Sequence, residues 1–275
     1  MNERAPIAIF DSGVGSYSVV REIREQLPLE SIVYFADRAS FPYGDKTPEE
    51  LVVIVEKSIR WLEERFAPKL IVVASNTPSL EVPETLQGSQ GVQVVGIFPP
   101  LKEAEEKSKS GRIAVLGTRG TVGSKKLDEY IQNQNLADET EIFKVDASKM
   151  VELVESGIFL ADSQETERVI RSVMDPILKE QSGIDVMTLS STHLPFLTGY
   201  LERLYPDIAF LDPASSLAAE IKTFLSGHAG LVDREAGDIR VLATENDSRE
   251  LTAENLSKTL GALGLHVEVE PTPVL

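Results

Sequence analysis

The stretch IAIFDSGVGS, residues 7–16, places four apolar residues directly before a carboxylate and a glycine turn. Such a run is typical of a buried strand, and the glycines let the backbone turn tightly at its end. Further short apolar runs follow along the chain, separated by longer charged stretches with helical periodicity. This alternation predicts an α/β fold in which crossover helices join the strands of mainly parallel sheets.

Ten short apolar runs are expected to be strands. They are residues 7–10, 32–36, 70–74, 92–97, 112–117, 141–145, 186–189, 208–211, 239–244 and 266–270. The stretch 47–66 predicts a helix, because Thr47 can cap it, a proline follows and acidic residues fill its first turn. Helices are also expected over 165–181, where Pro176 should introduce a kink, and over 215–225.

Two parts of the chain resemble each other in the same order. Residues 7–12 (IAIFDS) resemble 113–118 (IAVLGT), and residues 72–78 (VVASNTP) resemble 187–193 (MTLSSTH). Repeated order is the pattern that a duplication leaves, although apolar strands also resemble one another by composition alone. A duplication would give two similar α/β domains, and ligands of such sheets bind at the carboxyl ends of the strands.

Composition excludes several classes of protein. The 275 residues include 27 Lys and Arg against 44 Asp and Glu, a net charge of −17 that repels phosphate backbones and anionic lipids. We therefore expect no nucleic-acid partner and no membrane partner. No apolar run has the length of a membrane span and no leader pattern precedes the first strand, which predicts a cytoplasmic protein. The absence of cysteine excludes disulfides, thiolate metal sites and thiol nucleophiles.

Polar residues follow the first two predicted strands. Asp11 comes directly after a buried strand, where a carboxylate can accept or orient a proton, while Ser16 offers the simpler interpretation of a helix N-cap. The glycine turn matches neither a dinucleotide fingerprint nor a phosphate loop, so we expect no nucleotide cofactor. Asp37-Arg38 and the loop 41–46 (FPYGDK) combine an aromatic residue with both charge signs, and a surface turn with an ion pair is the alternative.

Two later strand ends carry hydroxyl residues. The stretch 75–79 (SNTPS) offers hydroxyls, an amide and backbone N–H groups for a carboxylate, with simple helix capping as the alternative. The stretch 191–193 (STH) adds His193, which can exchange a proton near neutral pH, although a lone histidine is more often structural. The three histidines lack patterned carboxylates, so the prediction is no metal.

Taken in order, these motifs resemble those of glutamate racemase and the wider aspartate/glutamate racemase superfamily. The family's Asp-Ser-Gly-Val-Gly-Gly is similar to residues 11–16, its Asp with Pro-Tyr-Gly to Asp37 and 42–44, and its Thr-Val-x-Ser to 121–124. Its Cys-Asn-Thr-Ala-Ser is similar to 75–79, its Val-Glu to 154–155 and its Gly-Cys-Thr-His-Tyr-Pro to 190–195. The resemblance spans nearly the whole chain. It implies two α/β domains, 1–98 with 212–275 and 99–211, related by a pseudo-twofold axis with the active-site cleft between them.

The resemblance also implies a reaction and its residues. The reaction is cofactor-independent interconversion of L- and D-glutamate, which supplies a peptidoglycan precursor, by two cysteines that flank the substrate's α-carbon. The resemblance assigns catalytic roles to Ser75, Ser191, Asp11, His193, Asp37 and Glu155. It assigns substrate binding to Ser12, Pro42, Tyr43, Gly44, Asn76, Thr77, Thr121 and Thr192. The implied partners are an acidic amino acid and a second copy of the chain in a homodimer. Because the net charge of the chain would repel an acidic ligand, local backbone dipoles or the cations Arg38, Lys46 or Arg119 must offset this repulsion.

Both cysteine positions of the family hold serine here, at Ser75 and Ser191. A serine hydroxyl is far less acidic than a thiol, whose pKa is about 8.5, and is not a usable base without strong activation. Two-thiol racemisation is therefore excluded for this chain, and we expect a protein that binds glutamate or a related acidic amino acid.

Three alternatives to this expectation stay open. One is a non-catalytic ligand-sensing or partner-binding pseudoenzyme, and another is a one-base decarboxylase or lyase with His193 as its acid. A third is that the serines are engineered replacements in an ordinary racemase. Against the third, four more positions depart from the family motifs, and natural divergence explains them together: Ser16, Pro78, Ser190 and Leu194.

Overall fold

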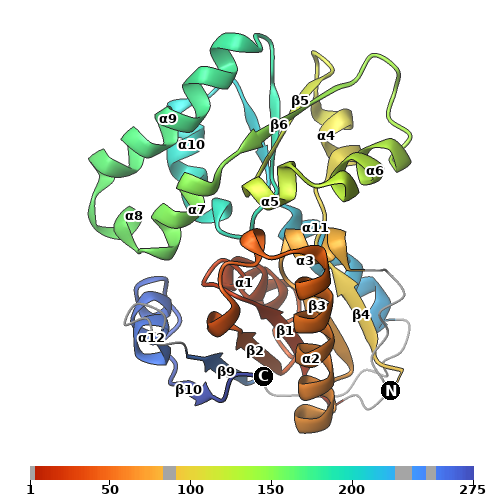
Figure 1. Ribbon diagram of the computed structural model, residues 1–275, viewed down its shortest axis with the longest axis vertical. Helices are drawn as coiled ribbons and strands as arrows, with labels where there is room; N and C mark the ends of the chain where they lie inside the picture. Colours follow the sequence, from red (N-terminus) through yellow and green to blue (C-terminus); the bar gives the residue numbers. More distant parts are fainter. Residues whose placement is uncertain (1–3, 83–90, 227–236, 246–251) are drawn as a thin grey trace. The chain divides into compact units, whose positions relative to one another are not determined.

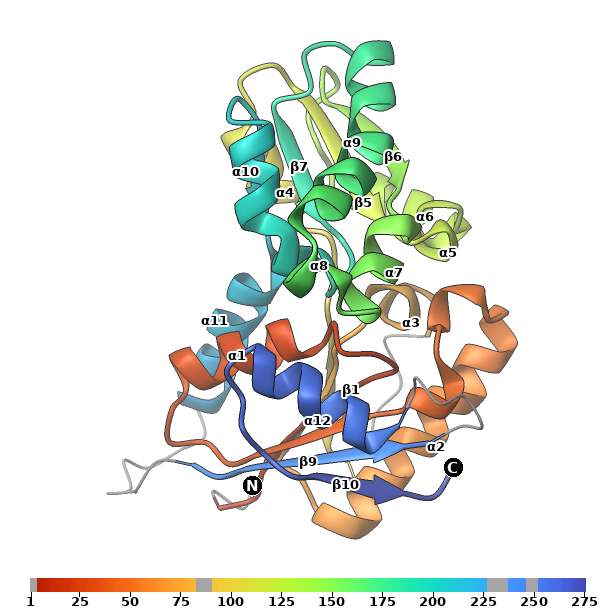
Figure 2. The ribbon, with the colours of Figure 1, turned by 90° about the vertical axis from the view of Figure 1, so that its left-hand side faces the viewer.

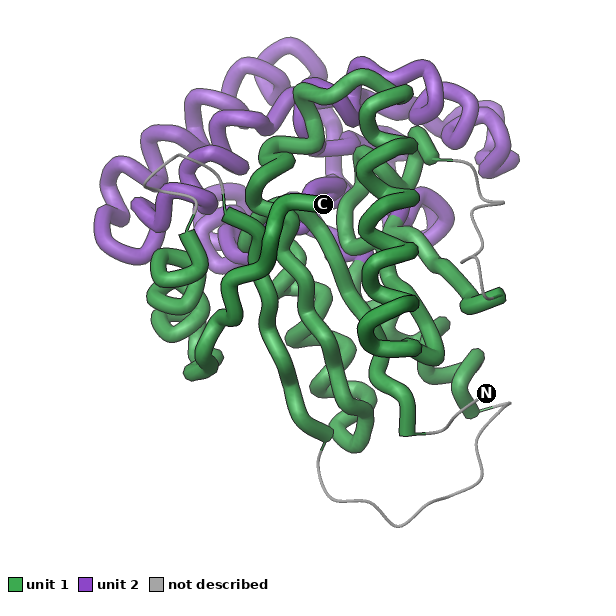
Figure 3. Tube along the Cα trace, turned by 60° about the horizontal axis from the view of Figure 1, so that its bottom comes forward, with its two compact units in different colours: residues 1–97, 214–275 green, residues 98–213 purple. Residues whose placement is uncertain are grey.

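The computed structural model describes residues 4–82, 91–226, 237–245 and 252–275. The chain forms two compact units, shown in different colours in Figure 3. The first unit contains Met1–Ile97 and Ala214–Leu275, and the second contains Phe98–Pro213. No helix in these described ranges combines the length and apolar character that crossing a membrane requires.

The first unit is built on a six-stranded parallel sheet (Figure 1). The strands lie in the order β10-β9-β2-β1-β3-β4. Their bounds are β1 (Ile7–Asp11), β2 (Ile32–Ala36), β3 (Leu70–Val73), β4 (Gln93–Gly96), β9 (Ile239–Thr244) and β10 (Val269–Thr272). Ile7 is in register with both Ile32 and Leu70, so the carboxyl ends of β1, β2 and β3 meet at one edge of the sheet.

Helices cover both faces of this first sheet. They are α1 (Tyr17–Gln26), η1 (Arg38–Ser40), η2 (Tyr43–Asp45), α2 (Pro48–Phe66), α3 (Asn76–Glu81), α11 (Pro213–Ser226) and α12 (Ala253–Ala262). Helix α2 begins with a capping box between Thr47 and Glu50. Its buried face packs on alternate strand residues, among them Phe10 and Phe35, while α1 lies on the opposite face of the sheet (Figure 2). Strands β1, β2 and β3 are buried at every residue, because alternate side chains face the helices on opposite sides of the sheet.

The second unit is built on a four-stranded parallel sheet in the order β6-β5-β7-β8. Its strands are β5 (Arg112–Gly117), β6 (Glu141–Asp146), β7 (Val186–Leu189) and β8 (Ala209–Leu211). Its helices are α4 (Leu101–Lys107), α5 (Arg119–Val122), α6 (Lys125–Asn133), α7 (Ser148–Glu155), α8 (Ile158–Ala161), α9 (Ser163–Glu180), η3 (Leu194–Leu197) and α10 (Thr198–Leu204). Helix α9 continues through Pro176 and ends four residues later.

The two sheets share one arrangement of four strands. The order β2-β1-β3-β4 in the first sheet matches β6-β5-β7-β8 in the second. The matching strands also end with the same hydrogen bond, from Ala74 N to Phe10 O (2.8 Å) and from Ser190 N to Leu116 O (2.7 Å). Common topology with a common detail supports the duplication that the sequence indicates.

The prediction of two mainly parallel α/β domains is confirmed, and each of the ten expected strands overlaps an observed one. The bounds expected for the last strand, 266–270, are wrong, because pairing with β9 begins only at Val269. Just before it, the carbonyl oxygen of Val267 accepts a hydrogen bond from Ser257 Oγ (2.9 Å) on α12. This bond ties the segment to a helix instead of to the sheet.

Asp185 stabilises the second unit just before β7. Its carboxylate accepts hydrogen bonds from Ser108 Oγ (2.6 Å), Lys109 N (2.7 Å) and Ser110 N (3.0 Å). Burial opposes ionisation of this carboxyl, but the hydrogen bonds from Ser108, Lys109 and Ser110 outweigh it and hold the pKa of Asp185 below its usual value. The ionised carboxylate therefore ties the loop that precedes β5 to the start of β7.

We expect Asp185→Asn to lower the free energy of unfolding by roughly 1–3 kcal/mol near neutral pH, because hydrogen bonds to a charged group are lost. A depressed folded-state pKa contributes stability above the unfolded pKa of about 3.9, and that stability is lost as pH falls through the folded value. The difference between the parent chain and the variant should therefore shrink below about pH 4. Urea unfolding across pH 3 to 7 measures it, and a constant difference would show that the charge contributes nothing.

Candidate functional site

Two buried carboxylates lie at the carboxyl edge of the first sheet. Asp11 is the last residue of β1, and Asp37, directly after β2, donates its backbone N–H to the Asp11 carbonyl (2.7 Å). Asp11, Asp37 and Arg38 are 2%, 3% and 3% exposed. The alternative of a surface turn at Asp37-Arg38 is therefore wrong, and the charges here are desolvated.

Tyr43 is hydrogen-bonded to one of these two carboxylates, that of Asp37. Its hydroxyl donates to Asp37 Oδ2 (3.2 Å). Burial first, and then the negative charges of Asp37 and Asp11, raise the pKa of the Tyr43 phenol well above its usual value. Tyr43 consequently stays protonated at neutral pH and acts as a hydrogen-bond donor.

Ser75 and Asn76 follow the neighbouring strand β3. Ser75 stands at the N-cap position of α3 but makes no capping bond with its side chain, so the capping alternative does not account for its hydroxyl. Asn76 donates Nδ2 to Ile97 O (3.4 Å), while its Oδ1 is buried with no hydrogen-bond partner among the described residues. A buried acceptor without a partner costs about 1–3 kcal/mol, which a donor on a ligand would offset.

The other predicted residues of the first unit lie around the same edge. Ser12 and Thr77 are buried, and Pro42 and Gly44 are half-buried beside Tyr43. Helix α3 contacts η2, so Asn76 and Thr77 belong to an element packed against the one that carries Tyr43. We call this group the first cluster: Asp11, Ser12, Asp37, Pro42, Tyr43, Gly44, Ser75, Asn76 and Thr77.

Ser16 has a role that the sequence does not indicate. It stands at the N-cap position of α1, yet its side chain makes no capping bond, so that interpretation is wrong. Instead its Oγ donates to the hydroxyl of Tyr34 (3.1 Å), which in turn donates to Gly13 O (3.1 Å). The serine that departs from the family motif thus helps to hold the glycine turn after β1.

The second unit carries its own polar group at the end of β7. His193 Nε2 lies 2.9 Å from Glu155 Oε2, and the two side chains are only 6% and 8% exposed. Helix α7, which ends at Glu155, contacts η3, which begins directly after His193. Ser191 and Thr192 precede the histidine and are also buried. Such a pair can hold and transfer a proton.

Thr121 lies on α5, after the neighbouring strand β5. Its Oγ1 is 3.0 Å from Thr118 Oγ1, and its side chain is buried. We call the group Thr121, Glu155, Ser191, Thr192 and His193 the second cluster. Glu155 and His193 are in direct contact, whereas Thr121 shares with them only its place after a strand that neighbours β7. Whether the residues of either cluster bind a ligand stays a prediction.

Ser75 and Ser191 occupy equivalent places in the two units. Each is the second residue after its strand, β3 or β7, next to the matched hydrogen bonds at Ala74 and Ser190. The two clusters differ in their chemistry. The first cluster contains two carboxylates, Asp11 and Asp37, whereas the second contains the pair of His193 and Glu155. No group of three or more His, Cys, Asp and Glu side chains arranged for a metal ion occurs in the described residues.

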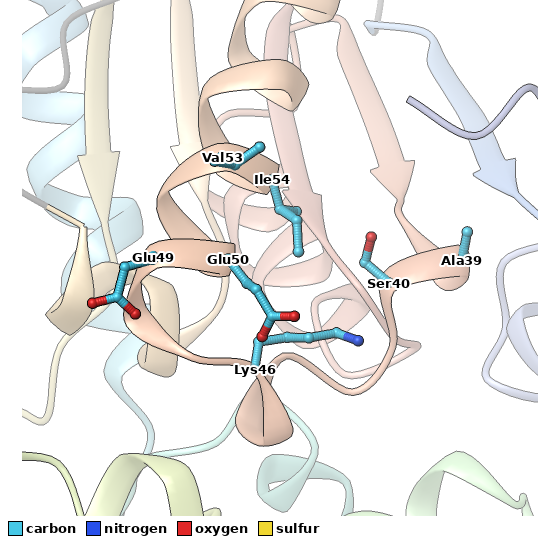
Figure 4. Close-up of a pocket in the computed structure, with 7 residues that line it drawn as sticks. All are labelled: Ala39, Ser40, Lys46, Glu49, Glu50, Val53 and Ile54. Atoms are coloured by element: carbon cyan, nitrogen blue, oxygen red, sulfur yellow. The ribbon is translucent and has the colours of Figure 1, made fainter.

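Two of the three cations considered for charge balance lie outside the clusters. Arg119 has an 84% exposed side chain and pairs with Asp146 (3.2 Å). Lys46 lines a surface hollow of about 500 Å³, together with Ala39 and Ser40 (Figure 4). Glu49, Glu50, Val53 and Ile54 of α2 form much of its wall, and none of the predicted site residues does. Arg38 is the cation buried next to Asp37.

The sequence analysis missed a residue that is hydrogen-bonded to the first cluster, Thr244. Its Oγ1 donates to Asp37 Oδ1 (2.9 Å) and accepts a hydrogen bond from Ala39 N (2.9 Å). The signal was present, because Thr244 is a polar residue at the end of a predicted strand like Asp11 and Ser75. It lacks the neighbouring motif that drew attention to those residues.

Comparisons with known proteins agree on one fold and family. No family model matches the chain. Glutamate racemase of Pseudomonas paraeruginosa is 33% identical over 235 residues, which are 85% of this chain and 86% of that protein. That of Deinococcus radiodurans is 31% identical over 272 residues, 98% of this chain and 91% of that protein.

Solved structures give the same result. Glutamate racemase RacE1 of Bacillus anthracis has a TM-score of 0.84 and 26% identity, covering 100% of this chain and 98% of that one. Escherichia coli glutamate racemase, in complex with L-glutamate and the activator UDP-MurNAc-Ala, has a TM-score of 0.82 and 29% identity, covering 98% of this chain and 99% of that one. The fold is that of the aspartate/glutamate racemase superfamily. Within it, the chain belongs to the glutamate racemase family.

Proposed function

We propose that this chain binds glutamate or a closely related acidic amino acid and that it does not perform two-thiol racemisation. The ligand class is supported by the related Escherichia coli glutamate racemase, which has been solved in complex with L-glutamate. No cofactor is needed for binding, because hydroxyls, amides and backbone N–H groups can hold carboxylates.

The main support for this proposal is that positions 75 and 191 both hold serine. The surroundings of these serines retain polar groups that a binding site needs: Asp11, Asp37, Tyr43 and Asn76 in the first cluster and the Glu155–His193 pair in the second. Racemisation also needs a competent acid or base on both faces of the α-carbon. A serine hydroxyl that is not activated supplies neither an acid nor a base for this reaction. The chain can therefore still bind the amino acid although it cannot racemise it by two thiols.

Calorimetric titration with L- and D-glutamate tests the binding. We expect one molecule bound per chain, and we expect Asn76→Ala to weaken the affinity about tenfold, because a buried hydrogen-bonding group is lost. Asn133→Ala, which changes an exposed asparagine on α6, is the matched control and should bind like the parent chain. If the parent chain takes up no acidic amino acid, the proposal is wrong.

The His193–Glu155 pair favours a second candidate function, a one-base reaction such as decarboxylation or elimination. The two side chains are buried at 2.9 Å, so a proton can be held on one side of a ligand without a matching histidine on the other. Such an enzyme would consume its substrate without racemising it. Product analysis after incubation with acidic amino acids separates this function from binding alone, which leaves the ligand unchanged.

A further inference from the structure

Thr244 lies in register with Asp37 at the carboxyl edge of the first sheet. Strand β9 pairs with β2 in parallel, with Ala243 opposite Ala36. Thr244 follows Ala243, and Asp37 follows Ala36, so the two residues come next to each other at the end of this pairing. Thr244 is fully buried. More than two hundred residues separate the pair in sequence, and the C-terminal part of the chain thereby supplies a side chain to the first cluster.

The directions of the hydrogen bonds around Thr244 are fixed by elementary chemistry. The backbone N–H of Ala39 can only donate, so Thr244 Oγ1 accepts that bond (2.9 Å) and directs its own proton to Asp37 Oδ1 (2.9 Å). The other carboxylate oxygen, Oδ2, receives the Tyr43 hydroxyl (3.2 Å). Each oxygen of Asp37 is therefore held by one hydroxyl donor.

We propose that Thr244 is a positioning residue that fixes the Asp37 carboxylate for ligand binding in the first cluster. The proposal rests on the proposed function, since it assigns Asp37 to a site that binds an acidic amino acid. Thr244 does not touch the ligand and acts through Asp37. It also holds η1, because Ala39 is the middle residue of that turn.

Two substitutions separate the hydroxyl from the shape of the side chain. Thr244→Val keeps the branched shape but removes both the donor to Asp37 and the acceptor for Ala39, whereas Thr244→Ser keeps the hydroxyl. Because Thr244 and Asp37 are buried and the bond to Ala39 N is partly buried, the valine variant leaves polar groups without these partners. Urea unfolding of both variants establishes that they are folded at the temperature of the measurements below.

Amide hydrogen exchange of Ala39, followed by NMR, tests the contact without any ligand. We expect Thr244→Val to accelerate the exchange of this amide at least tenfold relative to the parent chain, and Thr244→Ser to leave it close to the parent rate. Unchanged exchange of Ala39 in a folded Thr244→Val variant overturns the hydrogen bond on which the proposal stands.

A double-mutant cycle with Asp37→Ala tests the positioning itself. We expect Thr244→Val to weaken glutamate binding about tenfold in the parent background, Thr244→Ser to restore it, and Thr244→Val to have no further effect once Asp37 is alanine. An equal loss of affinity in both backgrounds, or no loss in a folded variant, overturns the proposal. A parent chain that binds no glutamate overturns the proposed function alone. The Ala39 exchange then tests whether Thr244 Oγ1 accepts the Ala39 N–H, the bond that directs the Thr244 proton to Asp37.

Discussion

Replacing Ser75 and Ser191 together by cysteine should create racemase activity in this chain. In deuterium oxide the parent chain should leave the α-hydrogen of L- and D-glutamate in place. The double variant should exchange it at least about a hundredfold faster and invert the configuration, because general acid–base groups contribute roughly 10²–10⁴-fold each. The physical reason is acidity, since only a thiol near pKa 8.5 offers a thiolate at neutral pH. Mass spectrometry and chiral chromatography measure exchange and inversion separately.

The two single variants are the matched controls for this experiment. Ser75→Cys and Ser191→Cys each supply one thiol, so each should exchange the α-hydrogen of at most one enantiomer without inverting it. Rapid exchange by the parent chain would show that a group other than a thiol acts as base, and His193 and Asp11 would be the residues to replace. If the double variant neither exchanges nor racemises either acidic amino acid, glutamate or aspartate, the ligand assignment fails.

Loss of the buried Lys69 ammonium should cause the largest loss of stability among the substitutions considered. Lys69 precedes β3 and pairs with Glu30, which precedes β2, and the two side chains are 3% and 14% exposed. In Lys69→Met the largely buried Glu30 carboxylate loses this cation. We expect the free energy of unfolding to fall by about 3–5 kcal/mol, the usual cost of breaking a buried pair. Urea unfolding at neutral pH measures the effect.

Two controls distinguish the loss of a buried pair from the loss of any lysine. Lys107 pairs with Glu103 on the surface, with side chains 51% and 36% exposed, so Lys107→Met should change stability by less than about 1 kcal/mol. Adding Glu30→Leu to Lys69→Met removes the carboxylate that has lost the Lys69 ammonium and should recover most of the lost stability. Equal effects of Lys69→Met and Lys107→Met would refute the argument from burial.

The fold was largely predictable because burial imposes a pattern on the sequence. Strands such as 32–36 and 239–244 are short apolar runs between polar turns, and their observed bounds match the expected ones. The exception at 266–268 depends on one hydrogen bond from Ser257 to Val267, a contact between segments that no local pattern encodes. Pro176 lies within α9, as the predicted helix 165–181 has it, because the surrounding helical residues outweigh the local preference of proline.

The candidate site was predictable only where local motifs mark it. Asp11 and Ser75 directly follow the predicted strands 7–10 and 70–74, so their place at the sheet edge follows from the chain itself. The burial of Arg38 and the bond between Thr244 and Asp37 depend on how distant segments pair, and a single sequence does not specify that. Ser16 illustrates the same limit, since local rules indicate a cap and its observed partners are the Tyr34 hydroxyl and the Gly13 carbonyl.

The division of the first unit into residues 1–97 and 214–275 also determines the order in which the chain can fold during synthesis. All residues of the second unit leave the ribosome before β9 and β10 exist, so its four-stranded sheet can be completed first. The first sheet must wait for β9, whose pairing with β2 closes a loop of about two hundred residues. Until then β2 is an open edge, and the nascent protein has an aggregation-prone strand that the finished protein covers.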